Sequence, residues 1–316
     1  MRVGYDAGPL LDPPTGVGRY TRELADALEM RGIELKRYAV ALGGRGDPAI
    51  KRRRFPARTM RSLWRRFDAP SIRGLTGAVD VVHGTNFVLP PLGDVPGVVT
   101  VHDLSFFRDD VFPGGEALRD LVPWSVDRAA RVLVPTEVIA REVCERFGVE
   151  AERVVATFEG VAPVFFGATP LSDGALGRLG IPGRFIVAVG TIEPRKNLAR
   201  LLDAWRRIRT ELDGWTLVLA GPAGWGPRLP ETPGVILTGW VGDETLPGLL
   251  AAADVFCYPS LYEGFGLPPL EAMAAGTPAV VGRYGTAQEV LGDAALLVTP
   301  TDVDALAEGL FQTATD

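Results

Sequence analysis

The chain has 316 residues, enough for about two domains, and its 47% hydrophobic and 23% charged residues are ordinary for a globular enzyme with ample core. It contains no run of 18 apolar residues of the kind that spans a membrane. The net charge of −6 argues against nucleic acid as a partner, because proteins that bind it are normally basic. This charge is uneven: residues 1–166 carry 23 Lys and Arg against 22 Asp and Glu, and residues 167–316 carry 10 against 17.

Cysteine and histidine are scarce. Cys144 and Cys257 lie in different halves of the chain, which favours free thiols and a reducing compartment. The N-terminal MRVGYDAG lacks the long apolar core of a signal peptide, so a cytoplasmic location is expected. His83 and His102 are the two histidines, and without a CxxC or HxxxH motif we expect no structural zinc.

Short runs rich in Val, Ile and Leu recur along the chain without alternating in polarity, which is typical of parallel strands covered on both faces. They are RVGYD (2–6), LKRYAVAL (35–42), VDVVHG (79–84), GVVTVHD (97–103), RVLVPT (131–136), FIVAVG (185–190), WTLVLAG (215–221), GVILTG (234–239), DVFCYPS (254–260), PAVVG (278–282) and AALLV (294–298). Apolar helical stripes lie between them, as in residues 20–28 and 198–208. The alternation predicts an α/β fold with doubly wound parallel sheets.

The halves divide near GATPLSDGALGRLGIPG (167–183), where Gly and Pro are dense and apolar periodicity is weak, so a linker is predicted there. We expect an N-terminal Rossmann-like domain at residues 1–170, binding the acceptor, and a C-terminal Rossmann-like domain at 171–316, binding the donor. Ligands of such sheets bind at the carboxyl ends of the strands, so both domains should turn those ends to a central cleft.

EGFGLPPLE (263–271) combines two glutamates, two glycines and two prolines directly before a helix. Gly264 and Gly266 allow close approach of a ligand, and a helix beginning at Pro268 offers its positive N-terminus to a phosphate. Glu263 and Glu271 are suited to accept hydrogen bonds from hydroxyls. A ligand with phosphates in the middle and hydroxyls at both ends would fit this segment, and a nucleotide sugar is such a ligand. The alternative is that Glu271 caps its helix and Glu263 is a solvated turn residue.

VGTIEPRKNL (189–198) supplies cations upstream. Arg195 and Lys196 follow the strand FIVAVG and precede a helix, in an acidic half of the chain. Adjacent cations at a strand's carboxyl end can neutralise a diphosphate as charge grows on a leaving group. The alternative, an exposed helix start, would set two cations against the helix dipole.

These segments together resemble a known family. EGFGLPPLEAMA resembles the E-x7-E motif of the retaining GT-B glycosyltransferases of family 4, and EPRKNL and GDAALLV resemble its flanking signatures. TGVGRYTREL resembles the family's N-terminal glycine loop, and VHDLSFF its histidine segment. The matches occur in the family's order over almost the whole chain.

The resemblance implies roles for residues of both domains. Glu263 would contact hydroxyls of the transferred sugar, Glu271 would hold the ribose, and the two cations would neutralise the diphosphate. In the first domain, His102 would face the sugar, and Gly16 and Gly18 would let their loop close over donor and acceptor. The implied donor-binding residues of the second domain are Arg195, Lys196, Val241, Glu263, Gly264, Phe265, Gly266, Leu267 and Glu271.

The reaction implied is transfer of a hexose from a nucleotide sugar to a glycan or a polyprenyl- or other lipid-linked acceptor, with retention and without a required metal or other cofactor. The motifs favour mannosyltransferases and GDP-mannose, with a UDP-sugar as the alternative. Acceptor attack on the face that the diphosphate leaves needs no carboxylate nucleophile. The other readings are a GT-B nucleotide-sugar epimerase or phosphorylase, and a non-catalytic sugar-nucleotide-binding protein.

The sequence departs from the family pattern at three places. Thr191 stands where many relatives carry Arg, so either Arg195 supplies the missing charge or phosphate binding is weaker. Gln288 stands where a proline is common. The family pattern continues with a final helix that returns to the first domain, whereas this sequence stops at FQTATD, so we expect either that the sequence is shortened or that this helix is lacking.

Two further segments have competing readings. DVD (302–304) resembles a metal-binding D-x-D, but Thr301 and Asp304 suit the N-terminal cap of a helix, which we favour. The basic stretch within residues 51–67 has helically spaced Met60, Leu63 and Trp64. It is either a helix lying on an anionic membrane surface, which would make the protein peripheral, or an amphipathic helix packed on the first domain.

Overall fold

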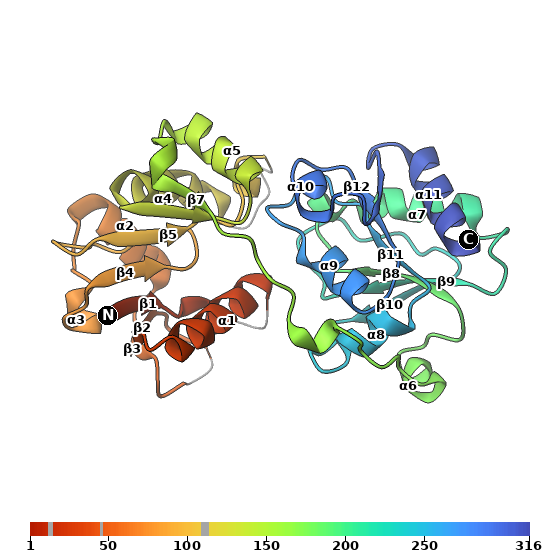
Figure 1. Ribbon diagram of the computed structural model, residues 1–316, viewed down its shortest axis with the longest axis horizontal. Helices are drawn as coiled ribbons and strands as arrows, with labels where there is room; N and C mark the ends of the chain where they lie inside the picture. The colour runs from red at the N-terminus through yellow and green to blue at the C-terminus, as the bar shows by residue number, and fades with distance from the viewer. Residues whose placement is uncertain (12–14, 45–46, 109–113) are drawn as a thin grey trace. The chain divides into compact units, whose positions relative to one another are not determined.

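The computed structural model describes residues 1–11, 15–44, 47–108 and 114–316. The chain forms two compact units, Met1–Phe158 and Glu159–Asp316. Each unit contains one parallel β-sheet with helices packed on it (Figure 1). The division falls earlier in the chain than the boundary at residue 170 that the Gly and Pro density indicates.

The first unit contains a seven-stranded sheet in the order β3-β2-β1-β4-β5-β6-β7, and its pairings are parallel. Its strands are β1 (Arg2–Asp6), β2 (Glu34–Val40), β3 (Lys51–Arg53), β4 (Val81–Gly84), β5 (Gly97–Thr100), β6 (Arg131–Val134) and β7 (Val154–Ala156). Val3 of β1 lies opposite Leu35 on one side and Val81 on the other, which fixes the register at the centre of the sheet. Strand order reverses between β1 and β4, so a ligand crevice is expected outside their carboxyl ends.

The helices of this unit are α1 (Gly16–Met30), α2 (Ala57–Phe67), α3 (Arg73–Thr76), α4 (Gly115–Arg128) and α5 (Glu137–Phe147). Threonine caps two of them: the Oγ1 atoms of Thr15 and Thr136 accept the backbone N–H groups of Gly18 and Ile139 at 3.1 and 3.2 Å. α5 ends at Gly148, whose φ of 65° suits glycine. The caps show why α1 and α5 begin where they do.

The basic stretch at residues 51–67 forms β3, at the edge of the sheet, and α2. Met60 and Trp64 of α2 are 2% and 7% exposed and pack in a cluster with Val88 and Leu121. This packing confirms the amphipathic helix lying on the first unit. The apolar stripe is therefore not available for insertion into a membrane, although Phe67 at its end is 62% exposed.

The second unit contains a six-stranded sheet in the order β10-β9-β8-β11-β12-β13, again parallel. Its strands are β8 (Phe185–Val189), β9 (Thr216–Ala220), β10 (Val235–Gly239), β11 (Val255–Tyr258), β12 (Ala279–Gly282) and β13 (Leu296–Val298). β8 and β11 are neighbours although β9 and β10 lie between them in sequence. The strand order reverses there, so the two strands lead into connections on opposite faces of the sheet, and a crevice is expected outside their carboxyl ends.

The helices of the second unit are α6 (Asp173–Arg178), α7 (Leu198–Ile208), α8 (Leu246–Ala252), α9 (Leu267–Ala274), α10 (Ala287–Leu291) and α11 (Val303–Thr315). Ile186 of β8 packs with α7 and α11, whereas Val187 packs with α8 on the opposite face. Because both faces are covered, the strands are continuously apolar, as the sequence pattern predicted.

Two local predictions differ from the structure. The segment at 167–183 contains α6, and its Leu176 and Ile181 lie in the core of the second unit. The cap of α11 is Asp302, not Thr301: its Oδ1 accepts the N–H groups of Asp304 and Ala305 at 2.9 and 3.1 Å. DVD is therefore a helix start, as favoured. Over the described ranges, no helix has both the length and the apolarity needed to cross a membrane.

Candidate active site

The polar site of the second unit lies where β8 and β11 end side by side. β8 leads into a 3₁₀ turn at Pro194–Lys196, and the loop after β11 leads into α9. Asn197, with a φ of 58°, ends the turn, and its side-chain amide donates to the carbonyls of Pro259 and Pro300 at 3.0 and 2.6 Å. The loop after β8 is thereby fixed to the loops after β11 and β13.

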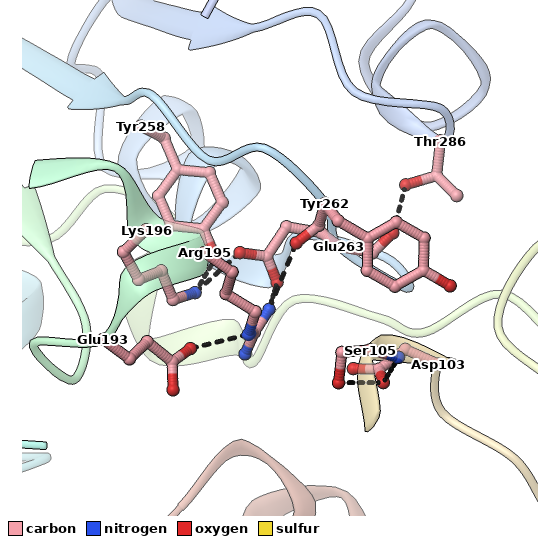
Figure 2. A network of polar contacts seen from close by, with 9 residues as sticks. All are labelled: Asp103, Ser105, Glu193, Arg195, Lys196, Tyr258, Tyr262, Glu263 and Thr286. Atoms are coloured by element: carbon pink, nitrogen blue, oxygen red, sulfur yellow. Dashed lines mark hydrogen bonds and ion pairs between the residues drawn. The ribbon is translucent and has the colours of Figure 1, made fainter. Parts of the chain in front are cut away.

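Lys196 and Glu263 form a buried ion pair across these strand ends (Figure 2). The Lys196 Nζ donates to Glu263 Oε1 at 2.7 Å and to the Tyr258 hydroxyl at 2.6 Å. Lys196 and Glu263 are 9% and 6% exposed. The reading of Glu263 as a solvated turn residue is therefore wrong.

Arg195 joins the same carboxylate from the solvent side. Its guanidinium contacts Glu263 Oε2, and its Nε lies 2.6 Å from an oxygen of Glu193. Its Nη1 also donates to the Tyr262 carbonyl at 3.3 Å. The Arg195 side chain is 23% exposed, against 3% for Glu193, so Arg195 is the member of this pair that a ligand from solvent can reach.

Electrostatics keep Glu263 ionised. Burial by itself raises the pKa of a carboxyl, but the charges of Arg195 and Lys196 and a hydrogen bond from Lys196 lower the pKa of Glu263 to about 2. Burial lowers the pKa of Lys196, and the attraction of Glu263 opposes that shift. Glu263 is thus an acceptor at neutral pH and not an acid.

The loop after β11 delivers a helix N-terminus beside this cluster. Gly266, the N-cap of α9, has a φ of 96° and no side chain with which to cap the helix. The helix begins at Leu267, one residue before the predicted start at Pro268, and the two prolines occupy its first turn. Glu271 is 4% exposed, so its carboxyl is also buried.

His102 lies in the first unit just after β5. Its Nε2 is 2.9 Å from the Thr85 carbonyl, and its ring meets Tyr20 and Phe87 edge-on at centroid distances of 4.9 and 5.7 Å. His83 is a buried, hydrogen-bonded histidine: its Nε2 is 2.8 Å from Thr100 Oγ1, and burial lowers its pKa to about 4. It is therefore neutral at physiological pH.

The glycines predicted in a loop lie in a helix. Gly16 and Gly18 belong to the first turn of α1. A Cβ on Gly18 would lie 3.2 Å from the Pro9 carbonyl oxygen, whereas one on Gly16 would meet nothing within 4 Å. The Thr15 cap is the sequence signal that distinguishes this helix start from a loop.

Within the second unit, Arg195, Lys196 and Glu263 are brought together, and residues 264–267 and Glu271 follow on the same segment. Val241 lies on a separate loop after β10, partly buried against the core. Sequence reasoning missed Glu193 and Tyr258, although Tyr258 stands at the carboxyl end of a predicted strand. In the described ranges, no group of three or more His, Cys, Asp and Glu residues could hold a metal ion.

Comparison with known proteins decides the family. Residues 14–165 match the model for glycosyltransferase family 4, and residues 183–316 match that for glycosyl transferases group 1. The O-antigen chain mannosyltransferase B of Escherichia coli is 30% identical over the whole of this chain and 91% of its own length. The chain belongs to glycosyltransferase family 4. An MMP alpha-(1->4)-mannosyltransferase of Mycolicibacterium hassiacum is 42% identical over 38% of this chain and 32% of its own.

Solved structures place this glycosyltransferase in the GT-B fold, as predicted. Sucrose-phosphate synthase from Thermosynechococcus elongatus matches with a TM-score of 0.75 at 20% identity, over 100% of this chain and 90% of its own. HepE of Anabaena, solved in complex with UDP and glucose, matches with a TM-score of 0.72 at 18% identity over the same shares. The two Rossmann-like units of the glycosyltransferase are those of this fold.

We expect Glu263→Gln to lower the free energy of unfolding by about 3 kcal/mol at pH 7, because the pKa falls from 4.5 to about 2 on folding. A carboxyl whose pKa is lowered by folding stabilises the folded protein at pH values above its pKa in the unfolded chain. The difference in unfolding free energy between the variant and wild type should therefore reach its full value above pH 4.5. It should shrink as the pH falls toward 2. Urea unfolding at several pH values measures it.

Glu308→Gln, on the exposed side of α11, is the matched control and should change stability by less than about 0.5 kcal/mol. A Glu263→Gln protein as stable as this control at pH 7 would contradict the charged pairing.

Proposed function

We propose that this glycosyltransferase transfers a hexose, with mannose favoured, from a nucleoside-diphosphate sugar to a glycan or lipid-linked acceptor with retention. The observation that carries the proposal is the meeting of Arg195, Lys196 and the N-terminus of α9 around the buried Glu263. Cations and a helix N-terminus at a topological switch point suit a diphosphate. An ionised acceptor beside them suits the hydroxyls of a sugar.

The roles follow from this charge arrangement. A sugar hydroxyl would donate to Glu263, while Arg195 and Lys196 turn donors toward the phosphates. The backbone of residues 264–267 would line the diphosphate, Glu271 would accept from the ribose, and Val241 would lie along the base. From the first unit, we assign His102 to the sugar and the start of α1, with Gly16 and Gly18, to the donor and acceptor.

The transfer we propose breaks the bond between the sugar's anomeric carbon and the phosphate oxygen and forms one to the acceptor oxygen on the same face. The acceptor's proton goes to the departing phosphate oxygen. Glu263, held ionised between two cations, is a poor nucleophile and no proton donor, which supports this route. The protein's contribution is then positioning and stabilisation of leaving-group charge, without a required metal.

The relatives bear on the sugar and the base. Those most similar to this chain include mannosyltransferases, which supports mannose and hence GDP-mannose. HepE, with the same fold, was solved with UDP and glucose, which keeps a UDP-sugar as the alternative donor. A thermal-shift screen with GDP-mannose and UDP-glucose distinguishes them, since a ligand at 100 times its Kd adds about 2.7 kcal/mol of stability.

Two other readings remain alternatives to transfer. A nucleotide-sugar epimerase or phosphorylase would not couple nucleotide release to a new glycan. A non-catalytic binding protein would bind the donor without slowly hydrolysing it when no acceptor is present. Nucleoside-diphosphate release that is slow alone and faster with acceptor, together with a new glycan, indicates transfer. Release that the acceptor does not change indicates an epimerase, and no release in either case indicates a phosphorylase or a binding protein.

We expect Lys196→Ala to lower kcat by about 100-fold or more, because it removes a buried cation from the leaving group. Release of GDP or UDP in the presence of acceptor measures this loss. Arg209→Ala, an exposed arginine just after α7, is the control and should retain wild-type kcat. A Lys196→Ala enzyme with normal kcat would refute the phosphate role.

We expect Glu271→Gln to weaken donor binding about tenfold, because a charged hydrogen bond to the ribose is replaced by a neutral one. Calorimetric titration with the nucleoside diphosphate measures this Kd. Glu308→Gln serves again as the control. If both variants bind like wild type, Glu271 does not hold the ribose.

The basic surface of α2 supports docking on an anionic membrane. Arg58, Arg65 and Arg66 are exposed, whereas the apolar face between them is buried in the first unit. Attraction is then electrostatic, worth roughly 1 kcal/mol for each cation near an anionic surface, and sensitive to salt. Such docking would bring the enzyme to a lipid-linked acceptor.

We expect replacement of Arg58, Arg65 and Arg66 by Gln to weaken sedimentation with phosphatidylserine-containing vesicles about 100-fold, at low ionic strength. Replacement of Arg73, Arg131 and Arg141, exposed arginines of the same unit, is the control for net charge. Wild type that stays in the supernatant, or equal loss in both triple variants, would rule out docking through α2.

A further inference from the structure

Tyr284, which follows β12, has a buried hydroxyl at the N-terminus of α9. The residue is 4% exposed, and its hydroxyl has no hydrogen-bond partner among the described residues. A Cβ built on Gly266, the N-cap of α9, would come within 2.3 Å of the Tyr284 hydroxyl oxygen. The hydroxyl therefore lies against the N-cap residue of α9, at the helix end to which the phosphates are assigned.

A buried hydroxyl without a partner needs an explanation, because losing water without gaining a hydrogen bond costs stability. Phenylalanine would fill the same space at no such cost. The neighbouring Tyr258, whose ring centroid lies 6.3 Å from that of Tyr284, differs in this respect: its hydroxyl accepts a hydrogen bond from the Lys196 ammonium. The Tyr284 hydroxyl is thus the one of this pair left for a ligand.

The surroundings make Tyr284 a neutral donor. Burial, and then the charge of Glu263, raise the pKa of its phenol well above the ordinary value, so it keeps its proton at neutral pH. The carboxylate oxygens of Glu263 already accept from Arg195 and Lys196. A phenolic O–H at the positive end of a helix complements an incoming anionic oxygen.

We propose that the Tyr284 hydroxyl donates a hydrogen bond to an oxygen of the donor's diphosphate, as a binding residue additional to Arg195 and Lys196. This inference rests on the proposed function of the site. The bond strengthens as negative charge develops on the leaving phosphate, so Tyr284 contributes to transfer as well as to binding. It also gives Gly266 a second reason to be glycine, since any side chain there would occupy the position of the hydroxyl.

The test is Tyr284→Phe, titrated calorimetrically with GDP and UDP and with the corresponding monophosphates. We expect the variant to bind the better nucleoside diphosphate at least about tenfold more weakly, and its preference over the monophosphate to shrink. The unliganded melting temperature should stay the same or rise, because an unpaired buried hydroxyl is removed.

Tyr38→Phe is the matched control, because Tyr38 of β2 is 2% exposed and its hydroxyl also has no partner among the described residues. It should bind nucleotides like wild type. Wild-type affinity in Tyr284→Phe, an equal loss in Tyr38→Phe, or a lower melting temperature for unliganded Tyr284→Phe would each overturn the inference. Failure of wild type to bind any nucleoside diphosphate would overturn the proposed function itself, and the inference with it.

Discussion

The buried ion pair between Lys196 and Glu263 is the interaction on which the site depends. It joins the end of β8 to the loop after β11, two segments brought together by strand order and not by sequence. Removing Glu263 would leave the buried Lys196 ammonium without its paired carboxylate, and breaking a buried pair in this way typically costs about 3–5 kcal/mol. The pair therefore holds both loops in one arrangement, with Arg195 attached on its solvent side.

Close backbone packing holds the same loop from its other side. A Cβ on Gly221 would lie 2.0 Å from the Gly190 carbonyl oxygen, and one on Gly224 would lie 2.3 Å from that of Ile192. Only glycine lets the loop after β9 approach so closely. The cations after β8 are thus positioned by glycines on one flank and by a carboxylate on the other. Fixed positions of this kind are what electrostatic stabilisation of a leaving group requires.

Sequence patterns predicted the covered strands well because burial on both faces makes them continuously apolar, as in β8 and β11. The strands β3 and β7 were missed: β3 is the basic KRR, which has no apolar run, and β7 is only the three-residue VVA. The cations and glycines of the site were found from their place after strands. The pairing of Glu263 with these cations was not predicted, because a contact between residues so far apart in sequence follows from the topology of the sheet. Likewise, only the Thr15 cap distinguishes the start of α1 from a glycine loop.

Charge balance in the cluster gives neutral hydrogen-bond donors weight in the proposed binding of the diphosphate. Arg195 and Lys196 are matched by Glu193 and Glu263, so the diphosphate of the proposed donor would approach a group without net positive charge. In the proposed complex, part of the attraction for the diphosphate then comes from groups that are not paired with an anion. The N-terminus of α9, where Gly266 has no side chain to cap the helix, and the phenol of Tyr284 beside it are groups of that kind. Neither is paired with Glu263, whose carboxylate is assigned to the sugar.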